Sequence, residues 1–194
     1  MPLRKTSRGF TLTELAIVLG IIGLILGAIW VAASKVYQSN RTDTAVKEIQ
    51  TILSGYRSLY STHAVDTGAG SWTDLTCVGV NSGFFPNDMI PPGTTCSAGN
   101  TASYPQHPWN SWLQVNGVQD WQAIMLVFIG LPRDACNSLA QQVSAAGDLV
   151  WEDINGTPVS LPPLGNGTPF TASQIAATCS AGNTNFIYFA FKAR

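Results

Sequence analysis

The chain has 194 residues, of which only 11% are charged, and its formal net charge at pH 7 is −1. This length suits one globular domain with an anchor, and the few basic residues beyond His63 (Arg133, Lys192 and Arg194) argue against a nucleic-acid-binding surface. Neither His63 nor His107 has the spacing of a metal site or a catalytic triad, so we expect no enzyme and no cofactor.

Residues 10–33 form an almost uninterrupted apolar run, in which Thr11, Thr13 and Glu14 are the polar exceptions. A helix of ~24 residues is ~36 Å long, which is enough to cross a bilayer core. The preceding segment, residues 1–9, carries three cations and no acid. Positive flanks stay in the cytoplasm, so the remainder of the chain is expected to face outward. A secretory signal would have a shorter apolar core, with its cleavage site after that core.

Glu14 requires an explanation, because a carboxylate within an apolar span costs ~2.5–3.5 kcal/mol on insertion scales. No Lys or Arg lies between Arg8 and Lys35, so the span itself provides no partner. Cleavage after Gly9 would create one, namely the α-amino group of Phe10, four residues before Glu14 on the same helical face. In a bundle of such helices, the carboxylate of one subunit could then pair with the amine of its neighbour.

The stretch Gly9-Phe10-Thr11-Leu12-Thr13-Glu14, followed by an apolar run, resembles the class III leader of type IV prepilins and type II pseudopilins. The resemblance implies that residues 1–9 are a leader peptide, removed between Gly9 and Phe10 by a prepilin peptidase. It further implies N-methylation of Phe10. It also assigns Glu14 to a salt bridge with a neighbouring amino terminus during filament assembly.

The helix is expected to continue beyond the anchor, because residues 34–61 contain no proline. Apolar side chains recur at helical spacing at Ala45, Ile49, Ile52, Leu53 and Tyr56, with polar residues on the other side. We therefore predict one helix of roughly fifty residues. Residues 10–33 would lie in the membrane or the filament core, and the amphipathic residues 34–62 would pack on a globular head, residues 63–194.

Residues 62–108 are expected to be irregular, since Gly, Ser, Asn, Pro and Thr dominate them. The four cysteines, Cys77, Cys96, Cys136 and Cys179, form no C-x-x-C pair, which argues against zinc. An even number in an exported domain predicts two disulfides. Three pairings are possible, and the sequential one, Cys77–Cys96 and Cys136–Cys179, requires the least crossing of the chain.

The second half of the head is predicted to be an antiparallel sheet with two helices. Residues 112–118 would form a strand that ends in a hairpin turn at Asn116-Gly117, and a second hairpin turn is expected at Asn155-Gly156. The expected strands are 112–118, 122–129, 149–154, 157–161 and 186–192, with the strand 122–129 broken by Gly130-Leu131-Pro132. The expected helices are 132–143 and a short one ending near 179, which opens with a capping box at Thr171–Gln174.

This half resembles the type IVb pilins, in particular the bundle-forming and thin conjugative-pilus pilins. The resemblance rests on a strand, then Leu131-Pro-Arg-Asp-Ala-Cys136 opening a helix, then Ala-Ala-Thr-Cys179 before a final aromatic strand. It implies the α+β fold of type IV pilins, in which a long N-terminal helix packs on an antiparallel sheet and disulfides staple the loops. In that family the pair matching Cys136 and Cys179 holds the C-terminal region together.

The function that this resemblance implies is a pilus subunit, which polymerises into a surface filament for attachment, aggregation or mating contact. The implied partners are further copies of the chain, a prepilin peptidase, an assembly ATPase, an inner-membrane platform protein and an outer-membrane secretin. The subunit would reside in the bacterial inner membrane before assembly and outside the cell afterwards. The alternatives are a pseudopilin or minor pilin of a secretion or assembly machine, and an anchored binding module that never polymerises. Five tryptophans are candidate partner anchors, although we expect most of them to lie in the core or to pin loops: Trp72, Trp109, Trp112, Trp121 and Trp151.

Overall fold

The computed structural model describes residues 11–65, 72–120 and 122–194. The long helix α1 (Leu12–Leu59) is 48 residues long, close to the roughly fifty that the sequence predicts. The chain divides into two compact units, residues 1–38 and residues 39–194, and α1 contributes to both of them. The second unit is an α+β head, as expected.

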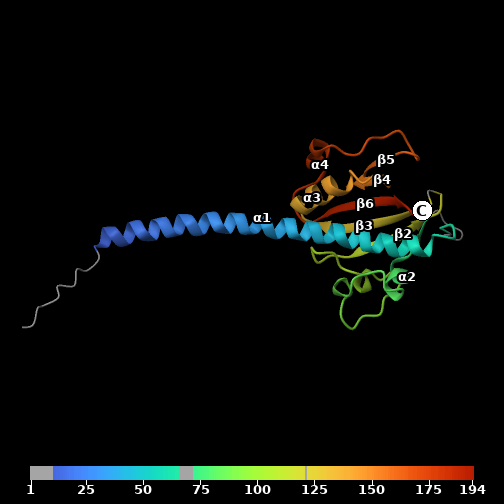
Figure 1. Cartoon of the computed structure of the whole chain (residues 1–194), viewed down its shortest axis with the longest axis horizontal. Helices are drawn as coiled ribbons and strands as arrows, with labels where there is room; N and C mark the ends of the chain where they lie inside the picture. The colour runs from blue at the N-terminus through green and yellow to red at the C-terminus, as the bar shows by residue number, and fades with distance from the viewer. Residues whose placement is uncertain (1–10, 66–71, 121) are drawn as a thin grey trace, which may run out of the picture. The chain divides into compact units, whose positions relative to one another are not determined.

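The head is built on one antiparallel sheet of six strands, in the order β1-β2-β3-β6-β4-β5 (Figure 1). The strands are β1 (Trp72–Asp74), β2 (Leu113–Val118), β3 (Ala123–Leu131), β4 (Leu149–Ile154), β5 (Thr157–Ser160) and β6 (Asn185–Lys192). The helices are α2 (Thr76–Asn81), α3 (Arg133–Val143) and α4 (Ala172–Thr178), with 3-10 turns η1 (Asn87–Met89) and η2 (Thr101–Ser103). The strands β3 and β6 lie inside the sheet, which explains why apolar residues occupy both of their faces.

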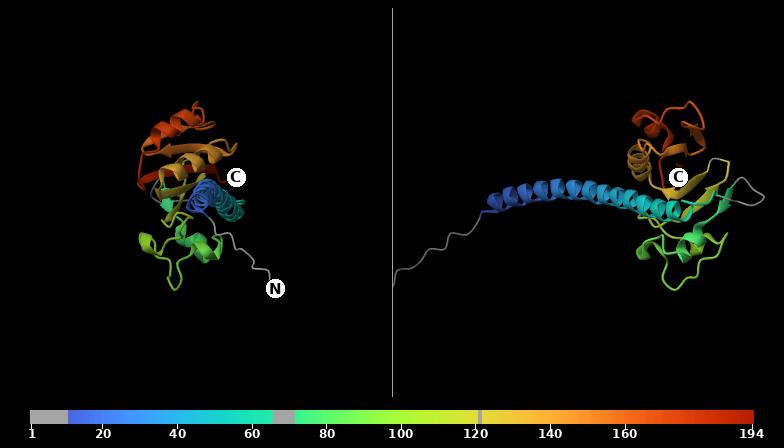
Figure 2. Two further views of the ribbon diagram at one scale, coloured as in Figure 1. Left: turned by 90° about the vertical axis from the view of Figure 1, so that its left-hand side faces the viewer. Right: turned by 45° about the vertical axis from the view of Figure 1, so that its right-hand side comes forward.

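The core lies between one face of this sheet and the second half of α1 (Figure 2). The predicted stripe on α1 is buried from Ala45 to Tyr56, and α3 adds Leu139 to the same cluster. We call this side of the sheet the inner face. The end of α1 is tied to the head by Arg57, which forms an ion pair with Asp148 and donates from Nε to the carbonyl of Lys192 at 3.0 Å.

The hairpin turn predicted at Asn116-Gly117 is wrong, because both residues lie within β2 and the chain reverses after Val118 instead. Glycine is needed at position 117 because side chains from another segment of the chain pack closely against its Cα. A Cβ at Gly117 would lie 2.8 Å from Cδ1 of Leu75 and 2.9 Å from Cγ1 of Val65. In contrast, Asn155-Gly156 does form the predicted turn between β4 and β5, with φ of 52° and 80°.

Two further expectations need correction. Gly130 does not end its strand, because β3 continues to Leu131 through a bulge in which Gly130 has φ of 75°. Residues 62–108 are less irregular than expected, since they include β1, α2 and both 3-10 turns. The strand β1 has three residues and depends on pairing with β2, where Trp72 lies opposite Val118. Elements this short leave no periodic pattern in the sequence.

Candidate functional site

The first unit presents a continuous apolar surface along α1. Every described residue from 11 to 38 is exposed, including Leu24 at 76% and Trp30 at 80%. Within the described part of the chain, α1 is the one helix that is long and apolar enough to cross a membrane. An exposed apolar surface of this extent indicates contact with lipid or with other protein.

Glu14 is the only charged residue between Thr11 and Ser34 in the sequence. Its Oε2 accepts hydrogen bonds from the backbone N and from Oγ1 of Thr11, both at 2.9 Å. In return, Oγ1 of Thr11 accepts from the backbone N of Glu14 at 3.3 Å. This reciprocal pair is a capping box, which satisfies free N–H groups at the start of a helix.

This capping role was not predicted for Glu14, although the Thr-x-x-Glu spacing of residues 11–14 signals it. Gly9 and Phe10, the predicted cleavage and methylation residues, lie outside the described residues. The salt bridge predicted between Glu14 and the amino group of a neighbouring Phe10 therefore stays a prediction.

The cysteines pair in sequence order. Cys77 and Cys96 have Cα atoms 5.3 Å apart, and Cys136 and Cys179 have Cα atoms 5.9 Å apart. The second bond joins the first turn of α3 to the end of α4, and both of its cysteines are buried. It therefore holds the segment between β5 and β6 against the core.

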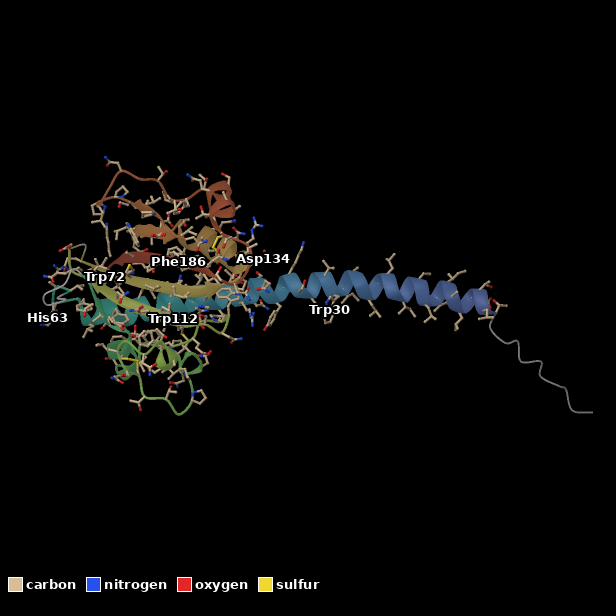
Figure 3. The ribbon with its side chains drawn as sticks, turned by 180° about the vertical axis from the view of Figure 1, so that it is seen from behind. Trp30, His63, Trp72, Trp112, Asp134 and Phe186 are labelled. Atoms are coloured by element: carbon tan, nitrogen blue, oxygen red, sulfur yellow. A yellow bond between two sulfur atoms is a disulfide. The ribbon has the colours of Figure 1, made fainter. Side chains whose placement is uncertain are left out.

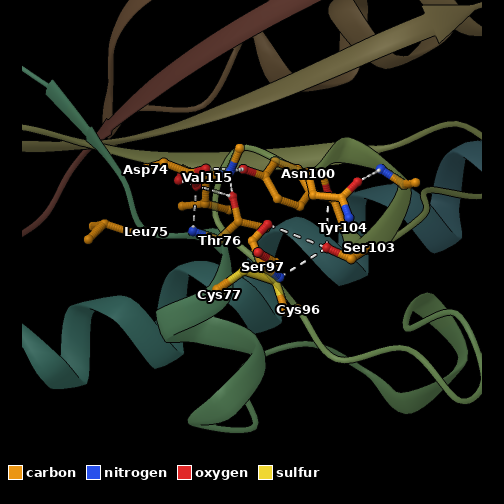
Figure 4. Close-up of a disulfide and its surroundings, with 12 residues drawn as sticks. Asp74, Leu75, Thr76, Cys77, Cys96, Ser97, Asn100, Ser103, Tyr104 and Val115 are labelled. Atoms are coloured by element: carbon orange, nitrogen blue, oxygen red, sulfur yellow. Dashed lines mark hydrogen bonds between the residues drawn. A yellow bond between two sulfur atoms is a disulfide. The ribbon is translucent and has the colours of Figure 1, made fainter.

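The first disulfide lies in a polar network that anchors its loop to the sheet (Figure 4). Oδ1 of Asp74 accepts from N of Thr76 at 2.9 Å and from Oγ1 of Thr76 at 2.6 Å. The hydroxyl of Tyr104 donates to Oδ2 of Asp74 and accepts from N of Gly99 at 2.7 Å. Since Asp74 belongs to β1, this network joins both ends of the disulfide loop to the edge of the sheet.

Two carboxyl groups are buried among the described residues of the head. Glu48 on α1 is only 7% exposed, and its Oε2 has no hydrogen-bond partner among the described residues. Burial, together with the charge of Asp88 on η1, raises the pKa of Glu48 to about 7. Burial also raises the pKa of Glu152, although Ser144 and the backbone N of Phe170 donate to that carboxyl at 2.6 and 3.0 Å and oppose the rise.

His107, which the sequence places in a loop, is buried beside the end of β3. Its Nε2 lies 2.9 Å from the carbonyl oxygen of Ile129, and burial lowers its pKa to about 4. The ring is therefore neutral at pH 7, donates to that carbonyl and serves the structure. Among the described residues, no group of three or more His, Cys, Asp or Glu side chains is placed to hold a metal ion.

The four described tryptophans of the head differ in burial. Trp109 is buried, Trp112 and Trp151 are half-buried and Trp72 is 58% exposed. Trp121 lies outside the described residues. Trp109 lies in the core, as expected for most of these side chains, which were predicted to lie in the core or to pin loops; Trp72 is the exposed exception.

Comparisons with known proteins agree with these features. Residues 39–192 match a family described as PilS N terminal, and residues 4–30 match the prokaryotic N-terminal methylation motif. The crystal structure of a type IVb pilin from Salmonella typhi has a similar fold, with a TM-score of 0.54 and 18% sequence identity. That similarity covers 76% of this chain and 97% of the other. No curated protein matches the chain.

Proposed function

The chain belongs to the PilS family and is a type IV pilin with the type IVb fold, and on this premise we propose that it polymerises into a surface filament. The exposed apolar surface of α1 over residues 12–36 carries this proposal. Apolar side chains that find no partner within their own chain gain by contact with lipid or with identical helices. Before assembly the apolar first half of α1 would occupy the inner membrane, and afterwards it would occupy the core of the filament.

The proposed route begins with removal of the leader, residues 1–9, between Gly9 and Phe10, followed by N-methylation of Phe10. The match to the methylation motif over residues 4–30 supports this order. Residues 10–33 then form the membrane span and later the filament core. The amphipathic residues 34–62 connect this span to the head, residues 63–194, which lies outside. The partners would be a prepilin peptidase, an assembly ATPase, a platform protein and a secretin. The filament would serve in attachment, aggregation or mating contact.

Glu14 would have two roles in this scheme. Its hydrogen bonds to Thr11 cap the helix in the single chain, as the geometry above describes. In the filament its negative charge would also attract the α-amino group of Phe10 in a neighbouring copy, because a charge in apolar surroundings is stabilised by an opposite charge. The cap requires a hydrogen-bond acceptor at this position, whereas the salt bridge requires a charge.

Two variants separate these roles in cells that carry the prepilin peptidase. Glu14→Val removes both the cap and the charge, whereas Glu14→Gln keeps a capping side chain and removes the charge. We expect mass spectrometry to show normal cleavage and methylation in both variants. We expect the yield of sheared filaments to fall by about tenfold or more in both, because the buried charge pair is lost. Thr13→Val, which changes the neighbouring polar side chain, is the matched control and should form filaments normally.

A wild-type filament yield from Glu14→Gln, with failure of Glu14→Val, would reduce Glu14 to a helix cap. A wild-type yield from both variants would remove any assembly role. If the mature protein on the cell surface still began at Met1, the filament proposal itself would be refuted.

A further inference from the structure

The face of the sheet opposite α1 carries an unusual set of side chains. We call this side of the sheet the outer face. Along each strand, side chains of the outer face alternate with those of the inner face. Gln114, Val127 and Tyr188 lie opposite one another on β2, β3 and β6. Trp72, opposite Val118, and Trp112, two residues before Gln114, lie on the same face towards opposite ends of β2, and both are labelled in Figure 3.

A hollow of ≈ 260 Å³ opens on the outer face. Val127, which is 2% exposed, forms part of its apolar floor, and the rings of Trp72, Trp112 and Tyr188 line it. Trp72 remains 58% exposed. Because an exposed indole ring costs free energy that burial would return, this ring offers stacking area to a ligand.

Besides Thr73 and Asp74, the hollow is lined by the two neutral amide side chains of Gln114 and Asn116. Nε2 of Gln114 donates to Oδ1 of Asn116 at 3.0 Å, and this bond orients the two groups. Among the described residues, no other side-chain hydrogen bond engages either amide. Each amide has two N–H donors and an acceptor oxygen, so both retain capacity to donate and to accept.

The remaining lining narrows the class of ligand. None of the described residues that line the hollow is Lys or Arg, which disfavours a phosphate or a carboxylate as the ligand. Asp74 contributes to the rim, but Thr76 and Tyr104 already engage its carboxylate. The groups left to bind a ligand are therefore aromatic rings and neutral amides, which both donate and accept hydrogen bonds.

We propose that the outer-face hollow binds a neutral hexopyranose unit of a glycan. A pyranose ring has a flat apolar side of C–H groups, which packs on an indole face, and a rim of hydroxyl groups. These hydroxyls both donate and accept, as the amides of Gln114 and Asn116 do. Trp72 would stack on the ring, and the amides would bind its hydroxyls.

We expect the hollow to be accessible to ligands outside the filament. This expectation rests on the proposed function, namely that the chain forms filaments. Residues Ala45 to Tyr56 of α1 cover the inner face, whereas the outer face carries the exposed ring of Trp72, so we expect the hollow to remain accessible in a filament. Filaments would then present one hollow for each subunit. Multiple weak sites on one fibre raise the overall affinity for a glycan-coated surface.

The test measures oligosaccharide binding by the full chain, purified in a detergent without a sugar headgroup. Cellotetraose, maltotetraose and chitotetraose are the probes, and isothermal calorimetry and tryptophan fluorescence are the readouts. We expect at least one probe to bind, and Trp72→Ala to weaken that binding by about tenfold. Trp72→Phe, which keeps an aromatic ring, should lose less affinity for the oligosaccharide than Trp72→Ala. Val78→Ala, which truncates another exposed apolar side chain of the head at 44% exposure, is the matched control.

Failure of all three probes to bind, or equal binding by the wild type and Trp72→Ala, would overturn the proposal. It would also be overturned if Trp72→Ala abolished association between copies in sugar-free buffer while no probe bound, since the face would then be a contact between subunits. Binding by the detergent-solubilised chain but not by isolated filaments would support the site and refute the head orientation assumed for the filament.

Discussion

Replacing Glu48 by glutamine is expected to stabilise the head at neutral pH. Glu48 is 93% buried, as its 7% exposure implies, and Oε2 lacks a partner among the described residues. Ionisation of the carboxyl therefore places a charge in an apolar site beside Asp88, without a compensating hydrogen bond on that oxygen. Glutamine has nearly the same shape and carries no charge at any pH.

The size of the expected stability difference between Glu48→Gln and the wild type follows from the raised pKa of Glu48. A group whose pKa is higher in the folded than in the unfolded chain contributes stability below its unfolded pKa and loses it as the pH rises through the folded pKa. For Glu48 this window runs from 4.5 to about 7. At ~1.4 kcal/mol per pH unit, the window corresponds to ~3 kcal/mol, of which we expect roughly 2 kcal/mol to be measurable at pH 8.

The assay is urea unfolding of the full chain in mild detergent, followed by tryptophan fluorescence. Glu48→Gln and the wild type should unfold at similar urea concentrations near pH 4, whereas the variant should be more stable by roughly 2 kcal/mol near pH 8. Asp43→Asn is the matched control, because Asp43 is an exposed carboxylate on the same helix. A constant difference between wild type and Glu48→Gln from acidic to alkaline pH would refute the reasoning, as would a variant that is less stable near pH 8.

Two further predictions concern the head. Replacing both Cys136 and Cys179 by serine opens a loop with a separation of 43 residues, and the chain-entropy model predicts a loss of about 4 kcal/mol, measurable by urea unfolding; a loss below ~1 kcal/mol would contradict it. Gly117→Ala should cost ~1–3 kcal/mol by the same assay, since its Cβ would lie 2.8 Å from Leu75, whereas Gly147→Ala, which meets no atom within 4 Å, should have little effect. Equal stability of the two alanine variants would contradict the packing around β2.

Local features of the chain were predictable because neighbouring residues alone decide them. The length of α1 follows from an apolar run that continues into a helical stripe from Ala45 to Tyr56, without a proline. The turn at Asn155 and the capping box at Thr171 depend on residues within one to three positions. The apolar surface along the first part of α1, with Glu14 as its single carboxylate, is also a local feature, because no distant segment of the chain is needed to form it.

Features that depend on distant segments were decided by the tertiary structure. Gly117 has the sequence signature of a turn, yet it lies in a strand because Leu75 and Val65 approach it from elsewhere in the chain. The raised pKa of Glu48 depends in part on Asp88 of η1, some forty residues later in the sequence, whose neighbour Met89 belongs to the same core cluster as Ile49 of α1. The outer-face hollow brings together side chains from four strands (β1, β2, β3 and β6) and from the segment before β2. Pairing between strands fixes such a cluster, and that pairing leaves no pattern in any single stretch of sequence.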